Sequence, residues 1–231
     1  MQIIEHKNGL KAPPLPWNTI QTVLLDMDGT LLDLNFDNVF FLEAIPAVHA
    51  QRHNLSLQEA KESIFASYNS IKGTLDWYDL NFWAATLDLN IVTLHRQTAH
   101  LIRMHDHTLP FLTALRHHAY PTHLVTNAHL HSLALKLSRT PIGEYFDSIT
   151  SCFHLGVPKE NVEFWSLFQQ KIGFDPTHTL LIDDSEPVLH AAKQFGITHL
   201  RHINTPSSCL PPKISDSFYS ISDLSAVMPS F

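Results

Sequence analysis

Cysteine is scarce in this sequence. The 231 residues include two cysteines, Cys152 and Cys209, which lie far apart and outside any C-x-x-C pair. That usage favours two reduced thiols, as in a cytoplasmic protein, over a disulfide framework. We therefore expect a protein that is stabilised by a packed core and not by crosslinks.

Long apolar runs and an excess of positive charge are also missing. No segment approaches the ~20 apolar residues that a membrane-spanning helix needs, and the segment from Met1 to Lys7 lacks the apolar stretch of a secretory signal. The net charge of −7 argues against a nucleic-acid-binding surface. A small anionic substrate is still compatible with this charge, because a metal ion and one lysine reverse the field locally. We expect a cytoplasmic globular protein without a membrane or nucleic-acid partner, either a monomer or a small homo-oligomer.

Histidine, in contrast, is abundant. The chain has 17 histidines, among them the pairs His105-x-His107 and His129-x-His131. These stretches lack the cysteine or acidic partners of a zinc site, and the sequence contains no H-E-x-x-H. We therefore expect most of the histidines to be solvated helix or loop residues.

The most informative stretch, residues 22–33, is T-V-L-L-D-M-D-G-T-L-L-D. Its short, continuous apolar run predicts a buried parallel strand, and the carboxyl end of such a strand borders the ligand crevice of an open α/β sheet. Asp26 and Asp28 share one face of an extended chain, and Gly29 permits a sharp turn after them. Two carboxylates at a buried strand end repel each other unless a cation lies between them.

Predicted strands and helices alternate through the second half of the chain. Strands are expected at 121–127, 148–153, 179–184 and 199–203. Helices are expected at 111–118, directly after 127, at about 160–172, at 185–196 and, as a short C-terminal helix, near 222–228. Such alternation is typical of an α/β fold with a doubly wound parallel sheet.

The segment between the first two predicted strands is too long for a simple crossover. It spans about a hundred residues, whereas a βαβ unit needs ~30. A capping box at Ser56-x-x-Glu59 and apolar residues at helical spacing over 76–87 and 91–105 predict helices here. We expect an all-helical insertion beside the strand ends, where it can exclude water and select substrates.

Polar side chains from several segments are predicted to meet, because the carboxyl ends of parallel strands lie at one edge of a sheet. That edge gathers Asp26, Asp28, Thr126, Asn127, Asp183 and Asp184, with Lys159 on the adjoining loop. Several carboxylates in one place favour a hard cation such as Mg²⁺. A lysine, a hydroxyl and a helix N-terminus opposite them suit a phosphoryl group.

In order and type, these residues resemble the four motifs of the haloacid dehalogenase-like (HAD) hydrolase superfamily across nearly the whole chain. The resemblance implies that Asp26 is a nucleophile that forms an aspartyl-phosphate and that Asp28 is the general acid/base. It also implies that Thr126 and the amide of Asn127 hold a phosphoryl oxygen, and that Lys159 stabilises Asp26 and the developing charge.

The resemblance further implies a Mg²⁺ cofactor, held by the Asp26 side chain, the Asp28 carbonyl and Asp184. Two departures from the family pattern occur: the lysine motif is in the order Pro-Lys, and Val188 stands where many members have a second acid. Asp183 is a candidate for that second role, so the division of labour between Asp183 and Asp184 stays open. Asp28 points to a phosphatase or mutase, since haloacid dehalogenases lack this aspartate and P-type ATPases have threonine there.

The runs 22–38, 75–83, 124–137 and 180–196 resemble the bacterial GMP/IMP nucleotidase branch of the superfamily. This implies hydrolysis of purine nucleoside 5′-monophosphates to nucleoside and phosphate. Trp77 and Tyr78 suit stacking on a planar base, with packing inside the helical insertion as the alternative. We also expect Gly29 and Thr30 to bind the substrate. A sugar-phosphate or phosphoglycolate phosphatase, a phosphomutase and a non-catalytic binding module on the same fold remain as alternatives.

The predicted architecture is therefore a Rossmann-like HAD core, formed by residues 18–33 and 107–231, with an inserted all-helical cap at 34–106. An extended N-terminal lead-in is expected over residues 1–17.

Overall fold

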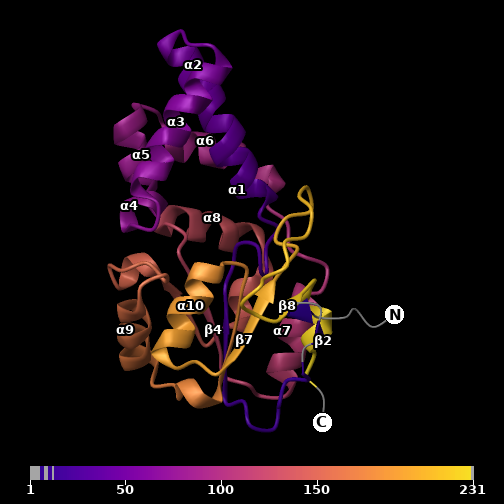
Figure 1. Ribbon diagram of the computed structural model, residues 1–231. Helices are drawn as coiled ribbons and strands as arrows, with labels where there is room; N and C mark the ends of the chain where they lie inside the picture. Colours follow the sequence, from indigo (N-terminus) through magenta and orange to yellow (C-terminus); the bar gives the residue numbers. More distant parts are fainter. Residues whose placement is uncertain (1–5, 8–9, 12, 230–231) are drawn as a thin grey trace.

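A sheet with helices on both faces forms the larger part of the molecule (Figure 1). The computed structural model describes residues 6–7, 10–11 and 13–229. The strands are β1 (His6–Lys7), β2 (Leu10–Lys11), β3 (Thr22–Leu25), β4 (Thr122–Thr126), β5 (Ser148–Ser151), β6 (Thr179–Asp183), β7 (His199–Ile203) and β8 (Ser220–Ile221). They lie in the order β2-β1-β8-β7-β6-β3-β4-β5. All neighbours from β8 to β5 are parallel, which confirms the predicted parallel sheet.

Apolar side chains of the central strand β3 point alternately into two cores. Val23 and Leu25 belong to the core under α7 (Thr108–His117) and α8 (Leu130–Arg139). Leu24 belongs to the opposite core, which α9 (Val162–Ile172) and α10 (Glu186–Phe195) cover. This alternation follows from the two-residue period of a strand. Because both faces are buried, β3 is a continuous apolar run in the sequence.

A separate group of helices between β3 and α7 lies above the carboxyl edge of the sheet (Figure 1). It consists of α1 (Asn35–Val39), the π-helix η1 (Phe40–Ala44), α2 (Ile45–His53), α3 (Leu57–Ile71), α4 (Leu75–Tyr78), α5 (Leu80–Leu87), α6 (Ile91–Gln97) and η2 (Ala99–Leu101). The group has its own apolar cluster, which includes Phe40, Ile64 and Trp83. We call it the cap. The limits of the two parts, 18–33 with 107–231 and 34–106, stay a prediction.

The cap differs from the sequence prediction in two places. The helix expected at 76–87 is divided at Asp79, which is extended (φ −82°, ψ 109°) and accepts a hydrogen bond from the Asn81 amide at 2.7 Å. Asp79 thereby caps α5. The apolar residues keep their helical spacing across this break, so the sequence pattern did not indicate it. The helix expected at 91–105 was too long, because α6 ends at Gln97 and the 3₁₀ turn η2 follows.

Smaller differences occur at the ends of the sheet region. The strand expected at 148–153 ends at Ser151 and continues as the 3₁₀ turn η4 (Cys152–His154). The expected C-terminal helix is the 3₁₀ turn η6 (Leu224–Val227), and further 3₁₀ turns are η3 (Pro141–Tyr145) and η5 (Pro176–His178). The two-residue strands β1, β2 and β8 were not predicted. Much of the predicted lead-in, at residues 1–5, 8–9 and 12, lies outside the described residues.

Within the described ranges, no helix combines the length and apolar character needed to cross a membrane.

Candidate active site

The ends of β3, β4 and β6 border one cavity of about 370 Å³ beneath the cap. Its wall contains the predicted residues Asp26, Asp28, Trp77, Tyr78, Thr126, Asn127, Lys159, Asp183 and Asp184. Gly29 and Thr30 are not part of this wall, since they are buried in the turn behind it. Residues that are far apart in the sequence therefore meet at one place, as the parallel topology requires.

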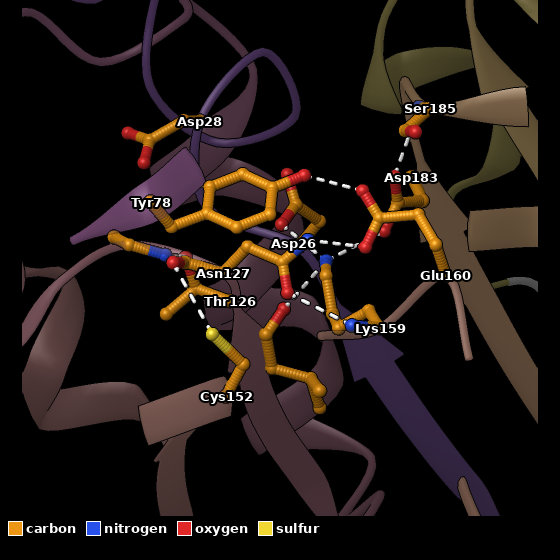
Figure 2. Close-up of polar contacts among 12 residues, drawn as sticks. Asp26, Asp28, Tyr78, Thr126, Asn127, Cys152, Lys159, Glu160, Asp183 and Ser185 are labelled. Carbon is orange, nitrogen blue, oxygen red and sulfur yellow. Dashed lines mark hydrogen bonds and ion pairs between the residues drawn. The ribbon is translucent and has the colours of Figure 1, made fainter. Parts of the chain in front are cut away.

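Lys159 is at the centre of the polar contacts at the cavity floor (Figure 2). Its ammonium donates to Asp26 Oδ1 at 2.6 Å, to Asp183 Oδ2 at 2.7 Å and to the Val125 carbonyl at 3.0 Å. Burial lowers the pKa of this lysine, but the charges of Asp183 and Asp26 outweigh the burial and raise it. Lys159 therefore stays charged and connects the end of β3 with the end of β6.

Three carboxylates surround a position suited to a cation. Asp26, Asp183 and Asp184 each offer an oxygen atom, and these oxygens lie within 4.8 Å of one another. Burial, followed by the charges of Asp183 and Asp28, raises the pKa of Asp26 to about 7 against the opposing effect of Lys159. Burial and the charges of Asp26 and Asp183 raise the pKa of Asp184 well above 3.8. One ammonium does not balance three carboxylates, and a hard divalent cation with oxygen ligands, such as Mg²⁺, fits this donor set.

The two acids after β6 have different surroundings. Both Asp183 oxygens are occupied by protein donors, Oδ1 by the Ser185 amide at 2.9 Å and Oδ2 by Lys159 at 2.7 Å. No other residue in the described part of the chain donates a hydrogen bond to the Asp184 carboxylate. Gly29 packs against it so closely that a Cβ would lie 2.6 Å from Asp184 Oδ2. Asp184 is thus the acid of the pair whose oxygens are available to a cation.

Thr126 and Asn127 place donors at the end of β4. The Thr126 hydroxyl accepts a hydrogen bond from the Ala128 amide at 3.0 Å, which leaves its own proton for an acceptor in the cavity. The Asn127 side chain accepts from the Lys159 amide at 2.9 Å and donates to Glu160 at 2.9 Å. Asn127 therefore also holds the loop that carries Lys159, a contact that the sequence did not predict.

Polar contacts at two residues, Glu160 and His129, join the cap to the region below it. The Tyr78 hydroxyl donates to Glu160 (Figure 2). His129 Nε2 lies 3.3 Å from Asp79 Oδ1 and 3.1 Å from Asn81 Nδ2. Burial and the adjacent Glu160 raise the pKa of Tyr78, so its hydroxyl keeps its proton and acts as a donor. Glu160 and His129 were not predicted as site residues from the sequence.

Most histidines in the described part of the chain are at least partly exposed, as expected, but four are not. The side chains of His95, His123, His129 and His202 are buried, at 2–7% exposed. Of these four, only His129 borders the cavity. The acidic cluster of Asp26, Asp183 and Asp184 contains no histidine, and no further metal-binding group occurs in the described ranges.

Aromatic residues form much of the cavity wall that the cap supplies. Tyr68 packs edge-on against Trp77 and Trp83, with ring centroids 5.4 and 4.7 Å apart. Trp77 packs on the cap cluster and also borders the cavity, together with Phe41 and Tyr78. Trp77 is therefore placed for cap packing and for ligand contact alike.

A second buried lysine lies at the side of the cavity. Lys136 of α8 is 1% exposed, and its Nζ is 2.7 Å from Asp28 Oδ1. The same atom donates to both oxygens of Asp37 on α1, at 2.8 and 2.9 Å. Burial lowers the pKa of Lys136, but Asp28 and Asp37 outweigh the burial and raise it. Neither Lys136 nor Asp37 was predicted, because nothing in the spacing of α8 distinguishes this lysine from a solvated one.

Comparison with known proteins agrees with this geometry. The family model for haloacid dehalogenase-like hydrolases matches residues 20–196. The chain is 37% identical to the GMP/IMP nucleotidase YrfG of Escherichia coli (strain K12) over 216 residues, which is 94% of this chain and 97% of that protein. The crystal structure of a HAD phosphatase from Thermococcus onnurineus superposes with a TM-score of 0.74 at 25% identity, covering 89% of this chain and 95% of that one.

The fold also matches that of the putative HAD-hydrolase YfnB from Bacillus subtilis, solved with bound magnesium. The TM-score is 0.62 at 19% identity, covering 89% of this chain and 96% of that one. The family match covers most of the chain, and the phosphatase relatives span almost its full length. The chain therefore belongs to the haloacid dehalogenase-like hydrolase family and is a phosphoric monoester hydrolase.

Proposed function

We propose that the protein is a Mg²⁺-dependent phosphatase that converts purine nucleoside 5′-monophosphates into nucleoside and phosphate through an aspartyl-phosphate. One observation carries this proposal: Asp26, Lys159 and Asp184 converge on the floor of a single cavity, and Asp28 borders the same cavity. A nucleophile, an acid/base, an ammonium group and a cation site thus lie around one cavity.

The reaction has two phosphoryl-transfer steps. In the first, a carboxylate oxygen of Asp26 attacks phosphorus, the ester P–O bond breaks and Asp28 gives its proton to the departing alkoxide. In the second, Asp28 takes a proton from water as the water oxygen attacks phosphorus, and the Asp26–phosphate bond breaks. Lys159 and the donors at Thr126 and Asn127 stabilise the charge that develops on the phosphoryl oxygens.

The proposed metal ligands are the Asp26 side chain, the Asp28 carbonyl and Asp184. Asp183 supports the site from behind, because its two oxygens already accept from Ser185 and Lys159. When bound, Mg²⁺ supplies positive charge that neutralises the phosphate and favours its approach to Asp26. The excess of carboxylates over ammonium groups at the floor supports this assignment.

The purine assignment is supported by the cap and by the 37% identical GMP/IMP nucleotidase. A ligand whose phosphate lies at the acidic floor extends toward Phe41, Trp77 and Tyr78, whose rings offer stacking surfaces to a planar base. Trp77→Ala should therefore raise KM for a purine nucleotide more than KM for p-nitrophenyl phosphate. Equal increases would assign Trp77 to cap packing alone.

A phosphate-release screen tests the substrate class. Purified protein with Mg²⁺ is assayed against purine and pyrimidine 5′-monophosphates, sugar phosphates and phosphoglycolate, with Asp26→Asn as the inactive control. We expect the highest kcat/KM with GMP and IMP. A preference for a sugar phosphate or phosphoglycolate would reassign the substrate within the same mechanism, and isomerisation without phosphate release would identify a mutase. Substrate binding without any turnover would identify a binding module.

A further inference from the structure

Among the described residues of α8, only Lys136 has a buried charged group that contacts two other elements. Its ammonium contacts Asp28, in the turn after β3, and Asp37, on cap helix α1. In the ribbon view, α8 lies between the sheet and the cap helices (Figure 1). The lysine thus joins three elements at the side of the cavity, at 1% exposure.

Packing does not account for a lysine at this position. Burying an ammonium costs several kcal/mol, and an apolar side chain of similar size fills the same space without that cost. Lys136 also packs over the Phe36 ring, 5.2 Å from its centroid, a contact that methionine could make as well. The retained charge therefore points to a role for its two carboxylate partners.

Those partners differ in their place relative to the reaction. Asp28 is the proposed proton donor to the leaving oxygen, whereas Asp37 belongs to cap helix α1 and pairs with the same ammonium. Both carboxylates border the cavity. Lys136 Nζ lies 2.7 Å from Asp28 Oδ1, so the charge contact is made at this oxygen, which accepts no hydrogen bond from the described residues. Because the ammonium lies nearest to Oδ1, Oδ2 is the oxygen more available to a leaving group.

We propose that Lys136 is a positioning residue for Asp28. It fixes Oδ1 so that Oδ2 faces the oxygen that leaves phosphorus, and Asp37 holds the lysine in place from the cap. This assignment rests on the proposed acid/base function of Asp28. It makes the alignment of the proton donor depend on an ion pair between the cap and α8, whereas the nucleophile Asp26 is held separately by Lys159.

The basicity of the leaving group tests the proposal. A nucleoside 5′-alkoxide needs a proton as it departs, whereas p-nitrophenolate is a weak base that leaves without one. The value of kcat/KM includes only steps up to departure of the leaving group. For Lys136→Met, we expect kcat/KM to fall by about 10²-fold with the nucleotide and by less than about threefold with p-nitrophenyl phosphate. Lys136→Arg should recover part of the loss.

Two further variants complete the experiment. Asp37→Asn keeps Lys136 and its contact with Asp28, so we expect the same selective loss at a smaller size. Lys171→Met removes an exposed lysine at the end of α9 and should leave both substrates unaffected. Equal losses on both substrates in Lys136→Met, or no loss on either, would overturn the positioning role.

A crystal structure of Lys136→Met provides a readout that does not depend on activity. We expect the Asp28 carboxylate to leave the orientation that it has in the unsubstituted protein, while Asp26 and Lys159 stay in place. An unmoved Asp28 would overturn the proposal. If the unsubstituted protein releases phosphate from neither substrate, the proposed function fails, and the crystal structure still decides whether Lys136 positions Asp28.

Discussion

Replacement of Gly29 by alanine tests the geometry of the proposed cation site. Gly29 has a φ of +86°, and a Cβ there would lie 2.6 Å from Asp184 Oδ2 and 2.9 Å from Pro206 Cβ. Contacts this short force Asp184 to move. Gly173, at the end of α9, has a φ of +82° and no atom within 4 Å of the corresponding Cβ position. Gly173→Ala is therefore a matched control that makes the same backbone change without the collision.

The structure sets the expected size of each effect. An alanine in the left-handed region costs about 1–2 kcal/mol, of which the reduced entropy of the unfolded chain offsets about 0.4–1 kcal/mol. We expect Gly173→Ala to lower the free energy of unfolding by about 1 kcal/mol. Gly29→Ala should lower it by about 2 kcal/mol, since the displaced Asp184 side chain adds about 0.5–1.5 kcal/mol of strain.

The two variants should differ more clearly in their response to metal. A displaced Asp184 weakens the cation site, so we expect Gly29→Ala to need about tenfold more Mg²⁺ for half-maximal phosphate release, equivalent to ~1.4 kcal/mol of binding free energy. Gly173→Ala should keep the native Mg²⁺ dependence. Urea unfolding followed by tryptophan fluorescence gives the stabilities. The reasoning is refuted if Gly29→Ala matches Gly173→Ala in both stability and metal dependence.

Four other outcomes are expected. Asp26→Asn should stay folded by circular dichroism but lose at least about 10³-fold in phosphate release; native turnover would exclude the covalent mechanism. EDTA should abolish activity and added Mg²⁺ restore it, whereas activity that persists in EDTA would contradict the metal site. Tyr78→Phe removes only the hydroxyl that donates to Glu160, and the free energy of urea unfolding should fall by about 1 kcal/mol; an unchanged value would mean that this bond contributes nothing. Burial raises the pKa of Asp33, but hydrogen bonds led by Ser208 outweigh it and lower the pKa below 3.8. The resulting stability is present above about pH 4 and is lost as the pH falls through the folded pKa. Asp33→Asn should therefore flatten the acid side of the stability profile, and an unchanged profile would be inconsistent with this shift.

The floor of the site could be predicted from the sequence because local patterns determine it. Asp26, Thr126 and Asp183 each come at or directly after the end of a continuous apolar run, and parallel pairing then requires the three ends to meet. Lys159 needed the family resemblance in addition, since its loop has no periodic signal. The structure places its ammonium between Asp26 and Asp183.

The contacts between cap and core could not be predicted in this way. Lys136 and Asp37 are 99 positions apart, and Tyr78 and Glu160 are 82 apart. Each pair forms only because the cap lies against α8 and the loop before α9, and no helix or strand period encodes that placement. A charged residue on an amphipathic helix is most often solvated, so Lys136 had no local feature that marked it as buried.

The two buried lysines hold the two aspartates of the D-x-D run separately. Lys159 joins Asp26 to Asp183 at the end of β6, whereas Lys136 joins Asp28 to Asp37 in the cap. Asp26 and Asp28 are separated by a single residue, yet each is held by a different part of the protein. A shift of the cap would therefore act on Asp28 through Asp37 and Lys136 while the contact of Asp26 with Lys159 persists. Separating either lysine from its aspartate would leave an uncompensated buried charge. Each ion pair therefore fixes its aspartate to a different element of the protein.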